Sequence, residues 1–140
     1  MKVLLAVDGS PYTRKMLAYL AAHPELLVDA TSVTAITVLP ALPPRARAAL
    51  GKDAVDSYQA DEASRVLDPV IKALSRQHAS PKAVWKVGPA GETIAKFADS
   101  GKYDLLVMGS HGSNALRNLV MGSVATKVLA QCTVPVLLVR

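Results

Sequence analysis

The sequence DLLVMGSHGSNALRNLVMGS, residues 104–123, leads from an apolar run through a glycine turn to a second glycine at its far end. Residues 104–108 predict a strand, because they form a short apolar run that stops at a turn signal. Residues 123–131 follow the second glycine and predict a helix. A strand that leads into such a loop and a helix that leads out of it are typical of a ligand site at the carboxyl edge of a parallel sheet.

The glycines of this loop indicate what the ligand is. Gly109 and Gly112 have no Cβ, so they let main-chain amides approach an anion closely and they permit positive φ. Gly122 and Ser123 open the helix, whose first N–H groups have no partner within the helix and favour negative charge. The Ser123 hydroxyl is placed to cap the helix or to bind an oxygen. We therefore expect the loop from Gly109 to Ser123 to hold a phosphate group.

Similar patterns recur along the rest of the chain. Four more apolar runs predict strands, at residues 2–7, 32–39, 83–87 and 134–139. Apolar residues at helical spacing and turn signals predict helices at residues 12–22, 53–78 and 91–100. Asp68 and Pro69 interrupt the long helix, so we expect a kink or two consecutive helices there. Residues 40–51 contain three prolines and predict the longest irregular segment.

Helical crossovers between the predicted strands require parallel strands with right-handed connections. The fold class is therefore α/β, with a doubly wound parallel five-stranded sheet and helices on both faces. Ligands bind such sheets where neighbouring crossovers leave to opposite faces. Asp8 follows the first strand and Gly109 follows the fourth. If these two strands are neighbours, their loops form the two lips of one crevice.

Composition limits the other possibilities. The chain has 140 residues with 51% apolar and 19% charged residues, which suits one domain over residues 1–140. It has no apolar run of the length that a membrane span needs and a single cysteine, so we expect no membrane partner and a cytoplasmic location. The net charge of +5 suits an anionic ligand, but the basic residues are scattered and aromatic residues are few. These features argue against nucleic acid as a partner.

Known catalytic motifs are missing from the sequence. The glycine loop has neither the Gly-Lys-Ser/Thr of a P-loop nor G-x-G-x-x-G, and the chain contains no G-x-S-x-G or H-E-x-x-H. Asp8 and His111 are the only local acid–base pair, and whether they meet depends on the inferred fold. We therefore expect no catalytic residues, and a protein that holds its ligand.

The loop nevertheless has a longer pattern, in which G-x-x-G is followed by nine residues and then by Gly-Ser, at Gly109, Gly112, Gly122 and Ser123. With this pattern the chain closely resembles the universal stress protein family. The resemblance extends from the opening VLLAVDGS through GPAGETI at residues 88–94 to the closing VPVLLV at residues 134–139. It implies an adenine nucleotide alpha hydrolase-like fold with flavodoxin-like layering, and a stress-associated protein that binds and senses ATP, or ADP or AMP.

The resemblance also implies the residues of the site. The positions that match the family's nucleotide contacts are Asp8, Val38, Gly109, His111, Gly112, Ser113, Gly122 and Ser123. Val38 would meet the adenine through its main chain, and Mg²⁺ would enter with the triphosphate through Asp8 or water. His111 stands where many ATP-binding members have arginine, and Ser113 and Asn114 fall where basic residues are common, so the phosphate grip is weaker here. From the residues alone, Asp8 is also suited to capping the first helix.

Assembly and rival functions follow from the same features. The last strand, Val134 to Val139, has no covering helix after it, so we expect a homodimer through this edge, as the family also implies. Some family members hydrolyse ATP slowly or phosphorylate themselves, and the resemblance implies at most such an activity for this chain. One alternative is a nucleotide-independent dimeric stress scaffold that acts through protein partners. An adenylate-using transferase is the other, but its H-I-G-H and S-G-G-x-D signatures do not occur.

Overall fold

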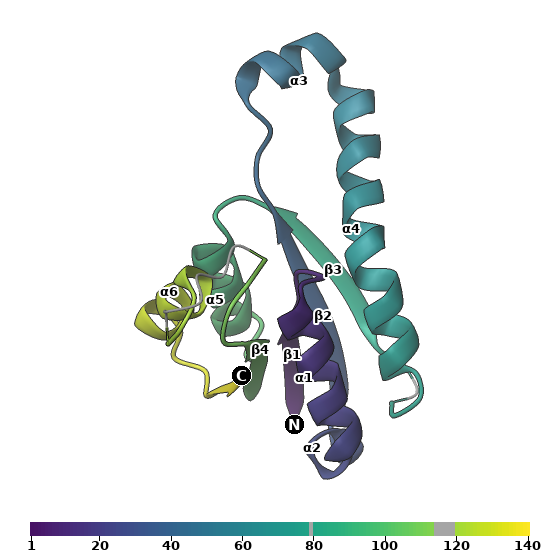
Figure 1. Cartoon of the computed structure of the whole chain (residues 1–140), viewed down its shortest axis with the longest axis vertical. Coiled ribbons are helices and arrows are strands. Elements are labelled where there is room, and N and C mark those ends of the chain that lie inside the picture. Colours follow the sequence, from purple (N-terminus) through teal and green to yellow (C-terminus); the bar gives the residue numbers. More distant parts are fainter. Residues whose placement is uncertain (79, 114–119) are drawn as a thin grey trace.

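A computed structural model describes residues 1–78, 80–113 and 120–140. Its five strands form one parallel sheet in the order β3-β2-β1-β4-β5 (Figure 1). The strands are β1 (Lys2–Ala6), β2 (Ser32–Leu39), β3 (Lys82–Val87), β4 (Leu105–Gly109) and β5 (Val136–Val139). The predicted fold class is confirmed.

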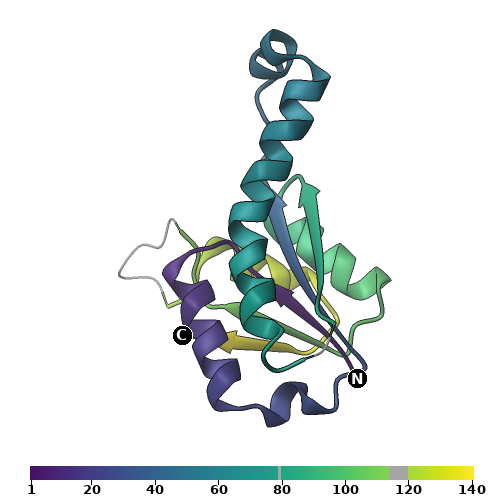
Figure 2. The same ribbon diagram turned by 90° about the vertical axis from the view of Figure 1, so that its right-hand side faces the viewer.

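Two layers of helices cover the sheet. One face carries α1 (Pro11–Ala22) and α4 (Lys52–Leu74), and the other carries α5 (Ala90–Ser100) and α6 (Ser123–Gln131) (Figures 1 and 2). Side chains of β1 alternate between these layers: Val3 and Leu5 belong to the core under α1 and α4, whereas Leu4 and Ala6 belong to the core under α5 and α6. A strand that is apolar on both faces is thereby buried on both faces.

The sheet order places the predicted crevice. β1 pairs in parallel with β4, and Ala6 lies opposite Met108 at their carboxyl ends. The chain leaves β1 toward α1 on one face and leaves β4 toward α6 on the other, so this pair is the point where crossovers change face. The loops that begin at Asp8 and Ser110 therefore open onto the same edge of the sheet.

One prediction about the helices was wrong. Residues 40–51 are not irregular throughout, because Pro44–Leu50 forms the helix α3. Proline suits the first position of a helix, where its missing N–H costs nothing, and Pro44 occupies that position. A short helix that was not predicted, α2 (Glu25–Val28), has Pro24 as its N-cap residue.

The long helix α4 continues through Pro69, so of the two expected outcomes, a kink or two consecutive helices, the second is not found. Proline removes one intrahelical hydrogen bond, but Leu67 and Val70 on either side of it are buried in the core. Tertiary packing therefore outweighs the local cost. The first turns of α4, together with α3, project beyond the carboxyl edge of the sheet (Figures 1 and 2). None of the described helices is both long and apolar enough to cross a membrane.

Candidate functional site

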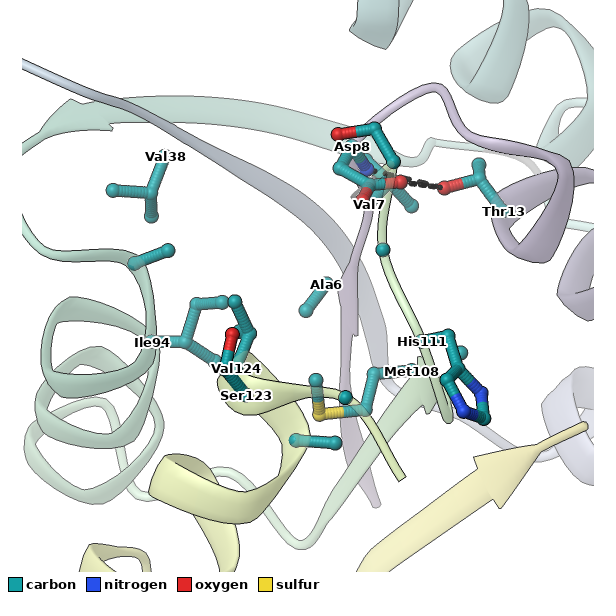
Figure 3. A pocket seen from close by; sticks show the side chains of 16 residues that line it. Ala6, Val7, Asp8, Thr13, Val38, Ile94, Met108, His111, Ser123 and Val124 are labelled. Carbon is teal, nitrogen blue, oxygen red and sulfur yellow. Dashed lines mark hydrogen bonds between the residues drawn. The ribbon is translucent and has the colours of Figure 1, made fainter. Parts of the chain in front are cut away.

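A pocket of about 330 Å³ lies at the carboxyl ends of β1 and β4 (Figure 3). All eight residues predicted from the sequence line it: Asp8, Val38, Gly109, His111, Gly112, Ser113, Gly122 and Ser123. Another eight lining residues were not predicted: Ala6, Val7, Thr13, Ala90, Ile94, Met108, Val124 and Ala125. Most of these are apolar residues of strands and helices, where the sequence pattern indicates a core position and carries no separate signal for a pocket wall.

One side of the pocket is apolar. Val38 of β2 and Ile94 of α5 lie there, on the side of the pocket away from Thr13 and His111 (Figure 3). Ala6 and Met108 continue this wall at the ends of β1 and β4. A wall of aliphatic side chains from three strands and a helix suits a flat, apolar group such as a nucleobase.

Asp8 is held in one orientation by the first turn of α1. Its Oδ1 accepts hydrogen bonds from the Ser10 amide at 2.9 Å and from the Thr13 hydroxyl at 3.0 Å. The Thr13 hydroxyl in turn accepts a hydrogen bond from the Asp8 amide at 3.1 Å. Asp8 therefore both ties down the start of the helix and lines the pocket, so its two sequence interpretations are compatible. Thr13 is buried and was missed, because a lone threonine in a helical pattern gives no signal of its own.

The three glycines of the loop serve close packing. A Cβ on Gly109 would lie 2.7 Å from the Tyr12 Cβ, one on Gly112 would lie 2.9 Å from the Asp8 Oδ2, and one on Gly122 would lie 3.0 Å from the His111 Cα. None of the three uses the positive φ that glycine permits, since the described glycines with positive φ are Gly9, Gly51 and Gly88. The loop glycines are needed because segments of the protein approach one another without room for a side chain.

The amino end of α6 faces the pocket. Gly122 is the residue before the helix, and its N–H donates to the Ser110 carbonyl at 2.7 Å. The first backbone donor that is bonded within the helix is Thr126, to the Gly122 carbonyl at 3.0 Å. The amides of Ser123, Val124 and Ala125 therefore lie in the first turn, where the helix itself supplies no acceptor and anions bind well.

His111 is the titratable side chain on the loop side of the pocket. Its Nδ1 lies 2.8 Å from the Ser110 hydroxyl, and its ring centroid lies 4.9 Å from that of Tyr12. Among the described lining residues there is no lysine or arginine, and Asp8 is the only acidic one. Groups of three or more His, Cys, Asp or Glu that would hold a metal are likewise absent from the part of the chain that the structure describes. Asn114 and Arg117, which the sequence analysis also considered, lie outside the described residues.

Comparisons with known proteins agree with this architecture. The model of the Universal stress protein family matches residues 1–140. The universal stress protein Slr1230 of Synechocystis is 33% identical over 99% of this chain, and the chain spans 42% of its length. Universal stress protein YxiE of Bacillus subtilis is 25% identical, and the match covers 99% of this chain and 98% of that protein.

Solved structures show the same fold. The structure of protein MJ0577 of Methanocaldococcus jannaschii has a TM-score of 0.77 and 23% identity, with 99% of this chain and 94% of that chain covered. A universal stress protein from Archaeoglobus fulgidus, solved with dAMP, has a TM-score of 0.66 and 21% identity, with 100% and 98% covered. An Arabidopsis thaliana family protein with AMP bound has a TM-score of 0.65 and 17% identity, with 99% and 90% covered.

Proposed function

Because this chain belongs to the universal stress protein family, we propose that it binds an adenine nucleotide, ATP in the first place, and serves as a cytoplasmic stress-associated sensor of it. The observation that carries the proposal is that all eight residues expected to contact a nucleotide line one pocket. Family members of the same fold that were solved with dAMP and AMP support the choice of ligand.

The two sides of the pocket suit the two ends of such a ligand. The base would lie against Val38 and Ile94, and a phosphate would lie at the amino end of α6, near Ser123. Asp8 uses its Oδ1 within the protein, and its Oδ2 lies close to Gly112, where an added Cβ would come within 2.9 Å of it. In this arrangement the Oδ2 is the atom that would meet a Mg²⁺ ion brought in by a triphosphate.

Dimerisation through the edge of the sheet belongs to the same proposal. β5 is an edge strand, and residues Val134 to Val139 would pair with a second copy. The Ser110 amide donates to the Val139 carbonyl at 2.9 Å, so the loop that lines the pocket is bonded to this edge. Light scattering at micromolar concentration tests the assembly, and a monomeric mass would contradict it.

Calorimetry with adenosine, AMP, ADP and ATP, with and without Mg²⁺, tests nucleotide binding directly. Ser123→Asp is the informative variant, because a carboxylate at the start of α6 repels phosphate but interacts favourably with the helix end, so the fold is retained. We expect it to weaken AMP binding at least tenfold, on the order of the repulsion between near charges at a protein surface. Ser123→Asn is the uncharged control. If none of the four compounds bound, the proposal would be refuted and the nucleotide-independent scaffold would be favoured.

A further inference from the structure

Tyr12 connects the first helix to the glycine loop. It lies in the first turn of α1 and is half-buried. Its Cβ packs directly on Gly109, where an added side chain would approach to 2.7 Å. The Tyr12 Cβ therefore packs on the last residue of β4, and the ring extends beyond it.

The ring of Tyr12 contacts the imidazole of His111. Their centroids are 4.9 Å apart and their planes are inclined by 33°, which is within the range of attractive aromatic pairs. The imidazole is also held by Ser110, whose hydroxyl lies 2.8 Å from Nδ1. Ser110 is itself buried, and its amide is bonded to the β5 edge strand. The Ser110 hydrogen bond and the Tyr12 ring contact both help to hold the His111 ring in the pocket wall.

Lys15 adds a positive charge to the same cluster. It lies one turn after Tyr12 on α1, and its Nζ is 4.7 Å from the centroid of the Tyr12 ring. This distance is typical of a cation–π contact, which holds a flexible lysine in place. Lysine and arginine are absent from the described pocket lining, and the exposed ammonium of Lys15 contacts the same Tyr12 ring that contacts His111.

We propose that Tyr12 is a positioning residue for the phosphate end of the nucleotide. Its ring helps to set the orientation of His111 in the pocket wall and also contacts the Lys15 ammonium. The first turn of α1 therefore decides how strongly the pocket prefers a phosphorylated ligand over a nucleoside. This inference rests on the proposed nucleotide binding, and it adds two residues that do not line the pocket.

The two functions that Tyr12 can have are distinguished by comparing ligands. A side chain that only packs against β4 would affect adenosine and AMP equally, because it would act through the stability of the whole site. A positioning residue for phosphate would affect AMP and spare adenosine, because adenosine has no group at that end. The ratio of the two dissociation constants is therefore the quantity to measure.

Calorimetric titration with AMP and with adenosine gives this ratio for four variants. Tyr12→Leu keeps the packing at Gly109 but removes the ring, and we expect it to weaken AMP about fivefold with adenosine unchanged. Tyr12→Phe keeps the ring and should retain the preference for AMP. Lys15→Gln should weaken AMP about twofold, and less at high salt. Lys72→Gln, which removes an exposed lysine in the last turn of α4, is the matched control and should change neither constant.

Proton NMR provides a readout that does not depend on binding. The ring current of Tyr12 displaces the Cε1 proton resonance of His111, and Tyr12→Leu should move that resonance whereas Tyr12→Phe should not. An unmoved resonance, or equal losses for AMP and adenosine in Tyr12→Leu, would overturn the inference while the proposed function stood. Failure of the unaltered chain to bind either compound would overturn both.

Discussion

Replacing Gly91 by alanine tests how far the pocket depends on the close approach of α5 and α6. Gly91 is buried in the first turn of α5. An added Cβ would lie 2.6 Å from the Cβ of Lys127 and 2.7 Å from its Cγ, and 3.4 Å from the Val124 carbonyl oxygen. The Cβ of Lys127 is fixed to the backbone of α6, so no rotamer change removes the clash and the two helices must separate.

Two opposing terms decide the outcome. Alanine is favoured over glycine inside a helix by up to about 1 kcal/mol, and by less in the first turn. An extra methyl group in a tightly packed contact costs about 1 to 3 kcal/mol. The ion pair between Lys127 and Glu92, at 3.7 Å with both side chains half exposed, contributes little to the balance. We therefore expect Gly91→Ala to lower the free energy of unfolding by about 1 kcal/mol.

The pocket should be affected together with stability. Ala90 and Ile94 on α5, and Ser123 and Val124 on α6, are all lining residues, so separation of the helices moves the apolar wall away from the amino end of α6. We expect weaker AMP binding by calorimetry, alongside a lower midpoint in urea unfolding followed by circular dichroism.

A second substitution gives the control. Lys127→Gly removes the side-chain atoms that the new methyl group would meet, at a helix-propensity cost of about 1 kcal/mol. In a double-mutant cycle, Gly91→Ala should therefore be less harmful, or even stabilising, in the Lys127→Gly background. If Gly91→Ala alone raised stability and left AMP binding unchanged, the helix contact would not limit the site and the reasoning would fail.

Three further predictions concern single side chains. Ser10 precedes α1, makes no side-chain cap bond and is only 4% exposed, with no partner for its hydroxyl among the described residues; Ser10→Ala should therefore stabilise the protein by about 1 kcal/mol in urea unfolding, whereas the loss usual at a helix cap would contradict this. The side-chain hydroxyl and the amide of Thr133 lower the pKa of Asp99. Between the folded and the unfolded pKa of Asp99, the unfolded chain therefore binds more protons than the folded one. The contribution of Asp99 to stability is present above about pH 4 and is lost as the pH falls through its folded pKa. Asp99→Asn should flatten the acid side of the stability profile, and an unchanged slope would argue against it. Burial raises the pKa of Cys132, so iodoacetamide should label the folded protein slowly at mildly alkaline pH and the urea-unfolded protein quickly; equal rates would show that the thiol is not protected.

Much of the fold was predictable from short-range patterns. Apolar runs between helical segments require parallel strands, and the fixed handedness of crossovers leaves few sheet orders. The pairing of β1 with β4 then brings Asp8 and the glycine loop to the same edge. The spacing of Gly109, Gly112, Gly122 and Ser123 was also informative. A glycine in the sequence marks a position where a side chain does not fit, even though the sequence does not show which segment packs against it.

Other features depended on contacts between distant segments. α4 continues through Pro69 because burial against the sheet outweighs a lost hydrogen bond, and local propensity does not contain that term. The glycines at 109 and 122 accommodate Tyr12 and His111, and not a positive φ. A residue pattern records which conformations a segment tolerates, but the distances between α1, β4 and the loop arise only when the whole sheet is assembled. For that reason the amino acids themselves indicated a phosphate loop, and the packed chain alone showed which side chains hold it in place.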